Sequence, residues 1–150
     1  MRVSVIGGSE VDVETYGEAR EVGRLLADRG HEVVCGGYSG VMEAACRGAS
    51  EAGGHAIGIL KGTDPAEGNE WVGTGIATGM GDARNALVVL NGAACIAIDG
   101  AAGTLSELGL AFVYDRPVAG LGTHDCSAFD GFRAVETPLE AVEYVERTVE

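Results

Sequence analysis

Short apolar runs alternate along the chain with longer stretches of helical periodicity, and glycine-rich turns join many of them. The predicted strands are Val3–Gly7, Glu32–Cys35, Ala56–Leu60, Val72–Thr78, Ala93–Ile98 and Arg116–Leu121. The predicted helices are Thr15–Arg29, Val41–Ala52, Asp82–Leu90, Thr104–Tyr114 and Thr137 to about Val149. Near-continuously apolar strands that alternate with helices are typical of an open parallel sheet with right-handed crossovers. We therefore predict one Rossmann-like α/β domain with helices on both faces, and irregular structure at Lys61–Trp71 and Thr123–Phe132.

The composition limits the classes of protein to which the chain can belong. The chain has 150 residues, 46% of them hydrophobic, which is enough to form a core without disulfides or metals. No apolar run reaches the roughly 18 residues that span a bilayer, and the first residues lack the form of a signal peptide. The four cysteines show no CxxC spacing and the three histidines are scattered, so we expect reduced thiols and no metal site. We expect a cytoplasmic protein with no membrane contact.

The charge balance is strongly acidic. Asp and Glu number 23 against 10 Lys and Arg, which gives a formal net charge of −13. A surface of this sign repels nucleic-acid phosphates, so we predict no nucleic-acid partner. Only one basic residue, Lys61, is a lysine. An acidic, lysine-poor surface is halophile-like, because salt screens its self-repulsion, and it predicts a melting temperature that depends on salt.

Four glycine-bearing turns follow predicted strands. In α/β sheets the carboxyl ends of parallel strands share one edge, where ligands bind near the point at which the strand order reverses. Tight strand-to-helix turns explain some of these glycines, but four converging turns favour a nucleotide or phosphate pocket. The pattern is neither a Walker A loop nor a dinucleotide fingerprint. The candidate ligand-binding residues in the first two turns are Gly8, Ser9, Gly36, Gly37 and Gly40.

The turn after the fifth predicted strand leads directly into a helix. Asp99, Gly100, Gly103 and Thr104 are candidate ligand-binding residues there, because backbone N–H groups at a helix N-terminus bind anions. Glu107, three residues after Thr104, allows two interpretations. It is either a functional carboxylate beside the anion site or the partner of Thr104 in a helix-capping box. The residues alone do not decide between the two.

Arg84 is a rare basic residue in the first turn of a predicted helix. Cations are unfavourable at helix N-termini, and a guanidinium can grip a phosphate or carboxylate with two parallel hydrogen bonds. We therefore favour a ligand contact for Arg84 over the alternative, an ion pair with Asp82 or another of the many acidic residues. Met80 and Asn85 lie beside it in the sequence and complete the set of candidate ligand-binding residues.

Three segments together resemble the LOG family, whose members were long labelled lysine decarboxylases. They are Gly36 to Ala45, Met80 with Arg84-Asn85, and Gly100 with Gly103-Thr104 and Glu107. The resemblance covers nearly the whole chain and is nearest to the short branch that includes molybdenum cofactor carrier proteins. LOG enzymes hydrolyse the N-glycosidic bond of nucleoside 5′-monophosphates. The resemblance implies that the Gly103-Thr104 turn holds a phosphate and that Arg84 and Glu107 form the catalytic pair, with homodimers or homotetramers as the assembly.

The motifs depart from the hydrolase pattern at three positions. Asp99 replaces a proline, Ala101 a glycine, and Asn85 a lysine. A phosphoribohydrolase therefore remains one hypothesis, and a non-catalytic carrier of a molybdopterin-type cofactor or nucleotide is the alternative. A nucleotide-sensing subunit is a third. None of these three hypotheses requires a cofactor. We reject pyridoxal phosphate chemistry because Lys61, the only lysine available for a Schiff base, precedes a flexible loop.

Overall fold

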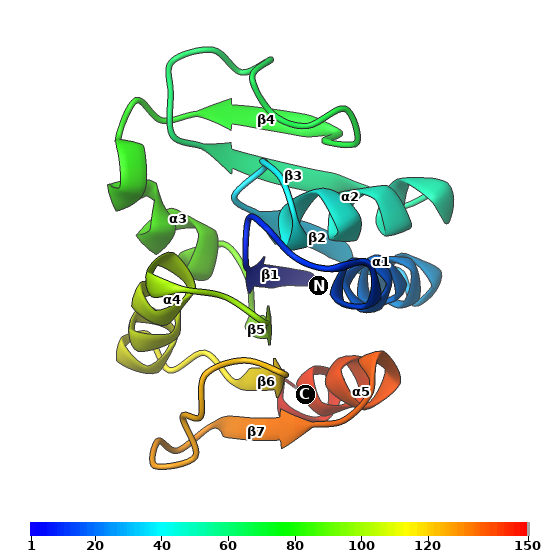
Figure 1. The fold of residues 1–150 in the computed structure, drawn as a ribbon, viewed down its shortest axis with the longest axis vertical. Helices are drawn as coiled ribbons and strands as arrows, with labels where there is room; N and C mark the ends of the chain where they lie inside the picture. The colour runs from blue at the N-terminus through cyan, green and yellow to red at the C-terminus, as the bar shows by residue number, and fades with distance from the viewer. Residues whose placement is uncertain (150) are drawn as a thin grey trace.

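A computed structural model describes residues 1–149. It contains one sheet of seven parallel strands in the order β4-β3-β2-β1-β5-β6-β7 (Figure 1). The strands are β1 (Arg2–Gly7), β2 (Glu32–Cys35), β3 (Ala56–Leu60), β4 (Thr74–Ala77), β5 (Ala94–Ile98), β6 (Val118–Leu121) and β7 (Phe132–Val135). This arrangement confirms the predicted open, parallel, Rossmann-like α/β fold.

Helices cover both faces of the sheet. They are α1 (Val13–Asp28), α2 (Val41–Glu51), α3 (Asn85–Leu90, preceded by the 3-10 turn η1, Gly81–Arg84), α4 (Ala102–Val113) and α5 (Pro138–Val149). Helices α1, α2 and α5 lie on one face, and α3 and α4 lie on the other (Figure 1). Within β1, Val3 and Val5 pack toward the first group, whereas Ile6 packs toward the second. This alternation is the two-residue period of a strand that is buried on both faces.

Helices α1 and α2 approach each other closely because glycines lie at their contact. A Cβ atom added at Gly23 would overlap the carbonyl of Ala45, and one added at Gly48 would overlap the carbonyl of Arg20. Small residues at these points allow the two backbones to pack together. The packing holds α2 against β1 and β2, so the turn that precedes α2 is fixed in position.

The strand order reverses between β1 and β5. From β1 the chain builds outward to β4, and it then returns to place β5 on the other side of β1, with Gly7 paired to Ile98 at the carboxyl ends of the two strands. In open α/β sheets such a switch point leaves a crevice beyond the strand ends. The turns that follow β1 and β5 therefore meet at one place.

The structure corrects several predicted boundaries. The segment Thr123–Phe132, expected to be irregular, leads into a strand, β7, which begins at Phe132 and lies at the edge of the sheet. Helix α4 begins at Ala102 rather than Thr104, and α1 begins at Val13 because the Asp12 carboxylate accepts a hydrogen bond from the N–H of Thr15 at 2.8 Å. The strand β4 is shorter than predicted. Within residues 1–149, no helix is long and apolar enough to cross a membrane.

Candidate functional site

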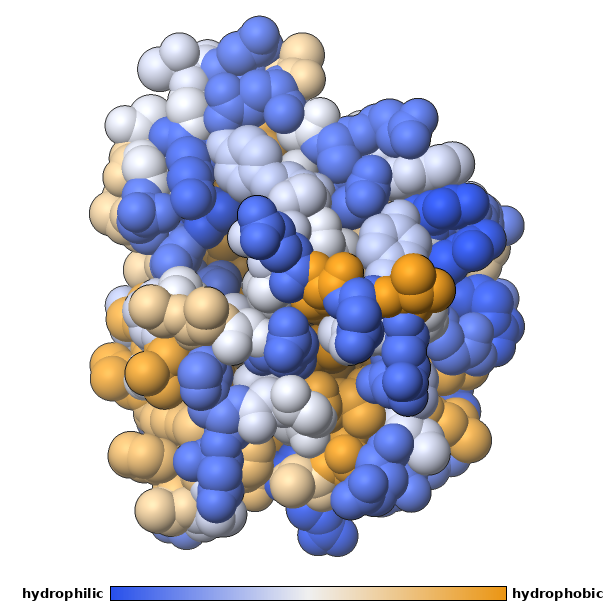
Figure 2. Space-filling model, viewed as in Figure 1, coloured by the Kyte–Doolittle hydropathy of each residue, from blue (hydrophilic) through white to orange (hydrophobic). Residues whose placement is uncertain are grey.

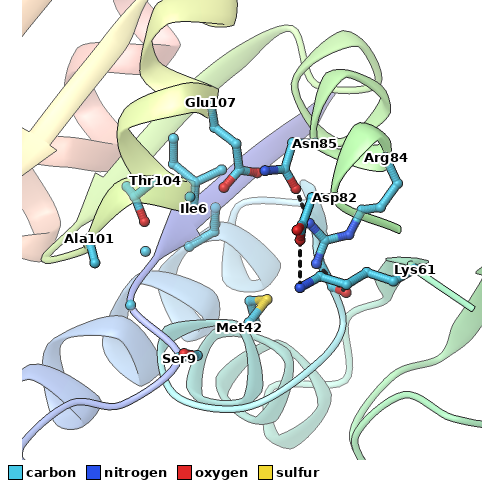
Figure 3. Close-up of a pocket in the computed structure, with 15 residues that line it drawn as sticks. Ile6, Ser9, Met42, Lys61, Asp82, Arg84, Asn85, Ala101, Thr104 and Glu107 are labelled. Atoms are coloured by element: carbon cyan, nitrogen blue, oxygen red, sulfur yellow. Dashed lines mark hydrogen bonds and ion pairs between the residues drawn. The ribbon is translucent and has the colours of Figure 1, made fainter. Parts of the chain in front are cut away.

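A cavity of about 150 Å³ lies at the switch point between β1 and β5. That volume has room for several water molecules or a phosphate group. Its walls come from the end of β1, the turns after β1 and β2, the end of β3, the segment η1–α3 and the first two turns of α4 (Figure 3). Segments from five separate parts of the chain therefore converge at one edge of the sheet.

The structure brings together eight of the residues predicted to form a site. They are Gly8, Ser9, Gly36, Arg84, Asn85, Gly103, Thr104 and Glu107. Five other predicted residues do not line the cavity: Gly37, Gly40, Met80, Asp99 and Gly100. The remaining lining residues were not predicted and are Val5, Ile6, Gly7, Met42, Lys61, Asp82 and Ala101.

The predicted residues that do not line the cavity shape the turns around it. Gly37 and Gly40 have positive φ angles of 82° and 66°, and a Cβ atom at Gly40 would overlap the carbonyl of Gly8. Asp99, with a φ of 53°, has its carbonyl held by the Thr123 hydroxyl at 2.7 Å. These positions demand a left-handed backbone, which glycine and, less often, aspartate adopt.

Met80 and Gly100 also lie outside the cavity wall. Gly100 has a φ of 116°, and a Cβ atom there would overlap Thr104. The side chain of Met80 is exposed beside η1. Gly100 therefore serves the turn that leads into α4, while Met80 takes no part in the cavity.

The start of α4 corrects the capping-box interpretation of Glu107. The N-cap residue is Ala101, and no side chain caps the helix among the described residues. Thr104 is consequently inside the first turn, and Glu107 lies in the second turn, too far along to cap it. A Cβ atom at Gly103 would meet nothing within 4 Å. Ala101, Gly103 and Thr104 line the cavity, so the start of α4 lies at its edge with no side-chain acceptor for the N-terminal N–H groups among the described residues, as in helix N-termini that bind anions.

Arg84 is a buried cation with no carboxylate beside it. Its side chain is 5% exposed and donates hydrogen bonds to the carbonyls of Ile59, at 2.8 Å, and Gly36, at 3.4 Å, and to Oδ1 of Asn85. Across residues 1–149 no Asp or Glu oxygen lies within 4.0 Å of its guanidinium, so the predicted alternative, an ion pair with Asp82 or another acidic residue, is wrong; Asp82 pairs with Lys61 instead. A buried charge that lacks a counter-ion is costly unless a ligand supplies one. Arg84 is therefore suited to bind an anion.

Tyr38 was missed in the sequence although it supports the cationic side of the cavity. The Arg84 guanidinium lies 5.7 Å and the Lys61 ammonium 5.9 Å from the centre of its ring, within the range of cation–π attraction. The Tyr38 hydroxyl accepts a hydrogen bond from the N–H of Lys61 at 2.7 Å and donates one to Glu67. The ring therefore ties the turn after β2 to the end of β3. Tyr38 lies within the glycine-rich turn Gly36–Gly40, but a tyrosine in such a turn gives no signal of this role by itself.

Glu107 projects into the cavity from α4 (Figure 3). It is 8% exposed, and no hydrogen bond to its carboxyl occurs among the described residues. Burial raises the pKa of Glu107 to about 7, although the charges of Arg84 and Lys61 act in the opposite direction. A carboxyl with this pKa can either hold or release a proton near neutral pH.

Lys61 directly follows β3, and its ammonium forms an ion pair with Oδ1 of Asp82 at 2.8 Å (Figure 3). The cavity therefore carries two cationic side chains, Arg84 and Lys61, and two acidic ones, Asp82 and Glu107. Its floor includes the apolar side chains of Ile6 and Met42. All four cysteines are buried and unpaired by disulfides, and residues 1–149 contain no cluster of His, Cys, Asp and Glu that could hold a metal ion.

Comparison with known proteins identifies the family of this chain. Residues 1–149 match the model of the SLOG cluster4 family. An uncharacterized protein of Archaeoglobus fulgidus is 41% identical over 144 residues, which cover 96% of this chain and 93% of that protein. These matches agree with the family resemblance inferred from the motifs.

Several solved structures share the fold along nearly the whole chain. The molybdenum cofactor binding protein of Rippkaea orientalis is 30% identical, with a TM-score of 0.93 over 99% of this chain and 97% of that one. The Moco carrier protein of Chlamydomonas reinhardtii is 30% identical, with a TM-score of 0.88 over 97% and 95%. Fold, sequence and length all agree: the chain belongs to the SLOG cluster4 family.

Proposed function

We propose that this protein binds a phosphorylated pterin of the molybdenum-cofactor type and acts as its carrier. The observation that carries the proposal is the buried guanidinium of Arg84, which has no carboxylate partner among residues 1–149 and lies across the cavity from the N-terminus of α4. Both features favour an anion. The two structural relatives named above are described as proteins that bind or carry this cofactor, which supports the choice of ligand.

The cavity suits the phosphate end of such a ligand. Arg84 and Lys61 supply positive charge, the hydroxyl of Thr104 lines the wall, and the start of α4 supplies backbone N–H groups. Phosphate monoesters are bound in proteins by this combination of donors. Ile6 and Met42 give apolar surface for the atoms that follow the phosphate.

Binding is favoured over bond cleavage by the state of the acidic residue. Stabilising a positively charged ribosyl transition state requires an ionised carboxylate. Burial raises the pKa of Glu107 to about 7, which disfavours this ionised form. Asn85, where the hydrolase motif has a lysine, makes no charge contribution; its amide hydrogen-bonds Arg84 and Ser106 instead.

Loading the purified protein with cofactor tests the proposal. Molybdenum cofactor released anaerobically from a molybdoenzyme is added, the protein is separated by gel filtration, and bound pterin is measured by fluorescence after oxidation. We expect the pterin to elute with the wild-type protein and Arg84→Met to weaken binding about tenfold or more, since hydrogen bonds to charged groups contribute roughly 1.5–3 kcal/mol. Arg133→Met, at an exposed arginine of β7 that does not line the cavity, is the matched control.

Pterin that fails to elute with the wild-type protein would contradict the proposal. Retention by Arg84→Met equal to that of wild type would do so as well. The melting temperature of each variant must be measured alongside, because Arg84 also bonds two backbone carbonyls. Arg84→Lys, which keeps the charge without the planar fork, distinguishes loss of charge from loss of geometry.

Hydrolysis of nucleoside 5′-monophosphates is the second candidate, and Glu107 is the observation that favours it. A carboxyl with a pKa of about 7 beside an anion site is also the form of a general acid. Incubation with AMP followed by chromatography for adenine tests this activity. Adenine release that disappears in Glu107→Gln would favour the hydrolase, and release no greater than in buffer would favour the carrier.

A further inference from the structure

The only lysine of the chain is held by an acidic side chain inside the proposed binding cavity. Lys61 and Asp82 both line the cavity, and the Lys61 ammonium lies 2.8 Å from Oδ1 of Asp82 (Figure 3). The neighbouring cation, Arg84, has no such partner among the described residues. Arg84 is thus available to an anionic ligand, whereas Lys61 is already paired with a carboxylate.

The ion pair between Asp82 and Lys61 can break at little cost. Its side chain is 85% exposed, and hydrogen bonding and charge from Lys61 lower the pKa of Asp82, so it is ionised at neutral pH. It lies in η1, directly after Gly81, where φ is 58°. Ion pairs between exposed side chains contribute little to stability. The contact therefore holds the ammonium without fixing it permanently.

The backbone around this ion pair is anchored independently of the two side chains. The N–H of Gly81 donates to the carbonyl of Lys61 at 3.0 Å, and the N–H of Gly79 donates to that of Gly62 at 2.8 Å. The Lys61 ammonium also lies within cation–π range of the Tyr38 ring, 5.9 Å from its centre. Exchange of the acidic partner therefore requires only rotation of two side chains.

We infer that Asp82 is an internal competitor for the phosphoryl group: its carboxylate holds the Lys61 ammonium, and the phosphate of the ligand takes that place on binding. This inference rests on the proposed function, because it assigns a role within the same anion site. The phosphate gains Lys61 as a second cation beside Arg84, while the carboxylate of Asp82 turns to solvent. Asp82 thereby limits the affinity of the site for anions and determines when Lys61 engages the ligand.

A double-mutant cycle tests the competition. The probe is phenyl phosphate, which has no glycosidic bond to hydrolyse and carries close to two negative charges at pH 7.5. Binding is measured by calorimetry for wild type, Asp82→Asn, Lys61→Met and the double variant. We expect Asp82→Asn to bind about two- to fivefold more tightly, the range that follows from breaking an exposed ion pair, and Lys61→Met to bind more weakly.

The double variant separates competition from simple repulsion. If Asp82 acts by occupying Lys61, Asp82→Asn gives little or no gain when Lys61 is already methionine. If Asp82 only repels the anion, the gain is as large or larger without Lys61, and the inference is wrong. Asp130→Asn is the matched control, because it removes the same charge from an exposed loop residue that does not line the cavity.

The single lysine permits a direct second measurement. In protein labelled with ¹³C,¹⁵N-lysine, all side-chain lysine signals come from Lys61. We expect its Nζ and Cε resonances to shift on titration with phenyl phosphate, and Asp82→Asn to shift them before any ligand is added. Binding of phenyl phosphate with unmoved Lys61 signals would overturn the inference and leave the proposed carrier function intact. Absence of binding in every variant would overturn both.

Discussion

The carboxyl of Glu107 couples the stability of the protein to pH in an unusual direction. Its pKa is about 7 in the folded protein, against an ordinary 4.5, so the folded state binds more protons than the unfolded state between these values. Stability must then fall as pH rises through this window. We expect Glu107→Gln to remove this slope and to stabilise the protein at pH 8 by about 3 kcal/mol.

Urea unfolding at pH 5 and pH 8 measures this effect. The comparison variant is Glu70→Gln, at an exposed loop residue, which should leave the difference between the two pH values as in wild type. Equal pH dependence in Glu107→Gln and wild type would show that the carboxyl is not destabilised by burial.

Single residues also mark the limit of what the sequence could predict about the site. Arg84 and Glu107 could be found because each stands in a local motif at a turn. Lys61 could not, since it reaches the cavity, and Tyr38 contacts it, only through the pairing of β2 with β3. The functional roles of all these residues stay predictions until binding is measured.

At the scale of elements, the contact between α1 and α2 depends on glycine. We expect Gly48→Ala to destabilise the protein by about 1–3 kcal/mol, because the added methyl would overlap the carbonyl of Arg20. Gly17→Ala, in α1 with nothing within 4 Å of its Cβ position, is the matched control and should stabilise by about 0.5–1 kcal/mol. In thermal unfolding, we expect the melting temperature to fall in Gly48→Ala and to rise in Gly17→Ala. A rise in both would show that the two helices do not pack closely at Gly48.

Elements with a strong apolar pattern could be predicted, and those with a weak one could not. The interior strands β1, β3 and β5 are almost entirely buried and were predicted to within a residue or so. The edge strand β7 has only four residues, two of them exposed, including Arg133, and so lacks a continuous apolar run. The start of α4 was misplaced because Thr104 is a good N-cap residue by type, whereas Ala101 holds that position.

For the whole molecule, the exposed apolar side chains around α3 and α4 predict self-association. Leu105 is 51% and Val113 is 71% exposed, and Leu90 and Phe129 are also exposed; Figure 2 shows apolar residues gathered on this side of the molecule. Surfaces of this kind commonly mark interfaces. We expect a homodimer or homotetramer by sedimentation at high salt, and a smaller species when Leu105 and Val113 are both changed to Glu.

Leu139→Glu serves as the control for this change, because Leu139 is an exposed apolar residue of α5 on the opposite face of the sheet. It should leave the sedimentation coefficient as in wild type. A monomeric wild-type protein at high salt would contradict the prediction. Unchanged sedimentation of the α4 variant would instead place the interface elsewhere.

The burial of Glu107 beside the anion site has a thermodynamic consequence for the ligand itself. A phosphate that enters the cavity raises the cost of a second negative charge there, so Glu107 takes up a proton when the anion binds. The apparent affinity should therefore fall as pH rises through 7. The calorimetric heat of binding should differ between phosphate-free buffers of low and high ionisation enthalpy in proportion to the fraction of a proton taken up. A bound anion would then dissociate more readily where the surroundings are more alkaline.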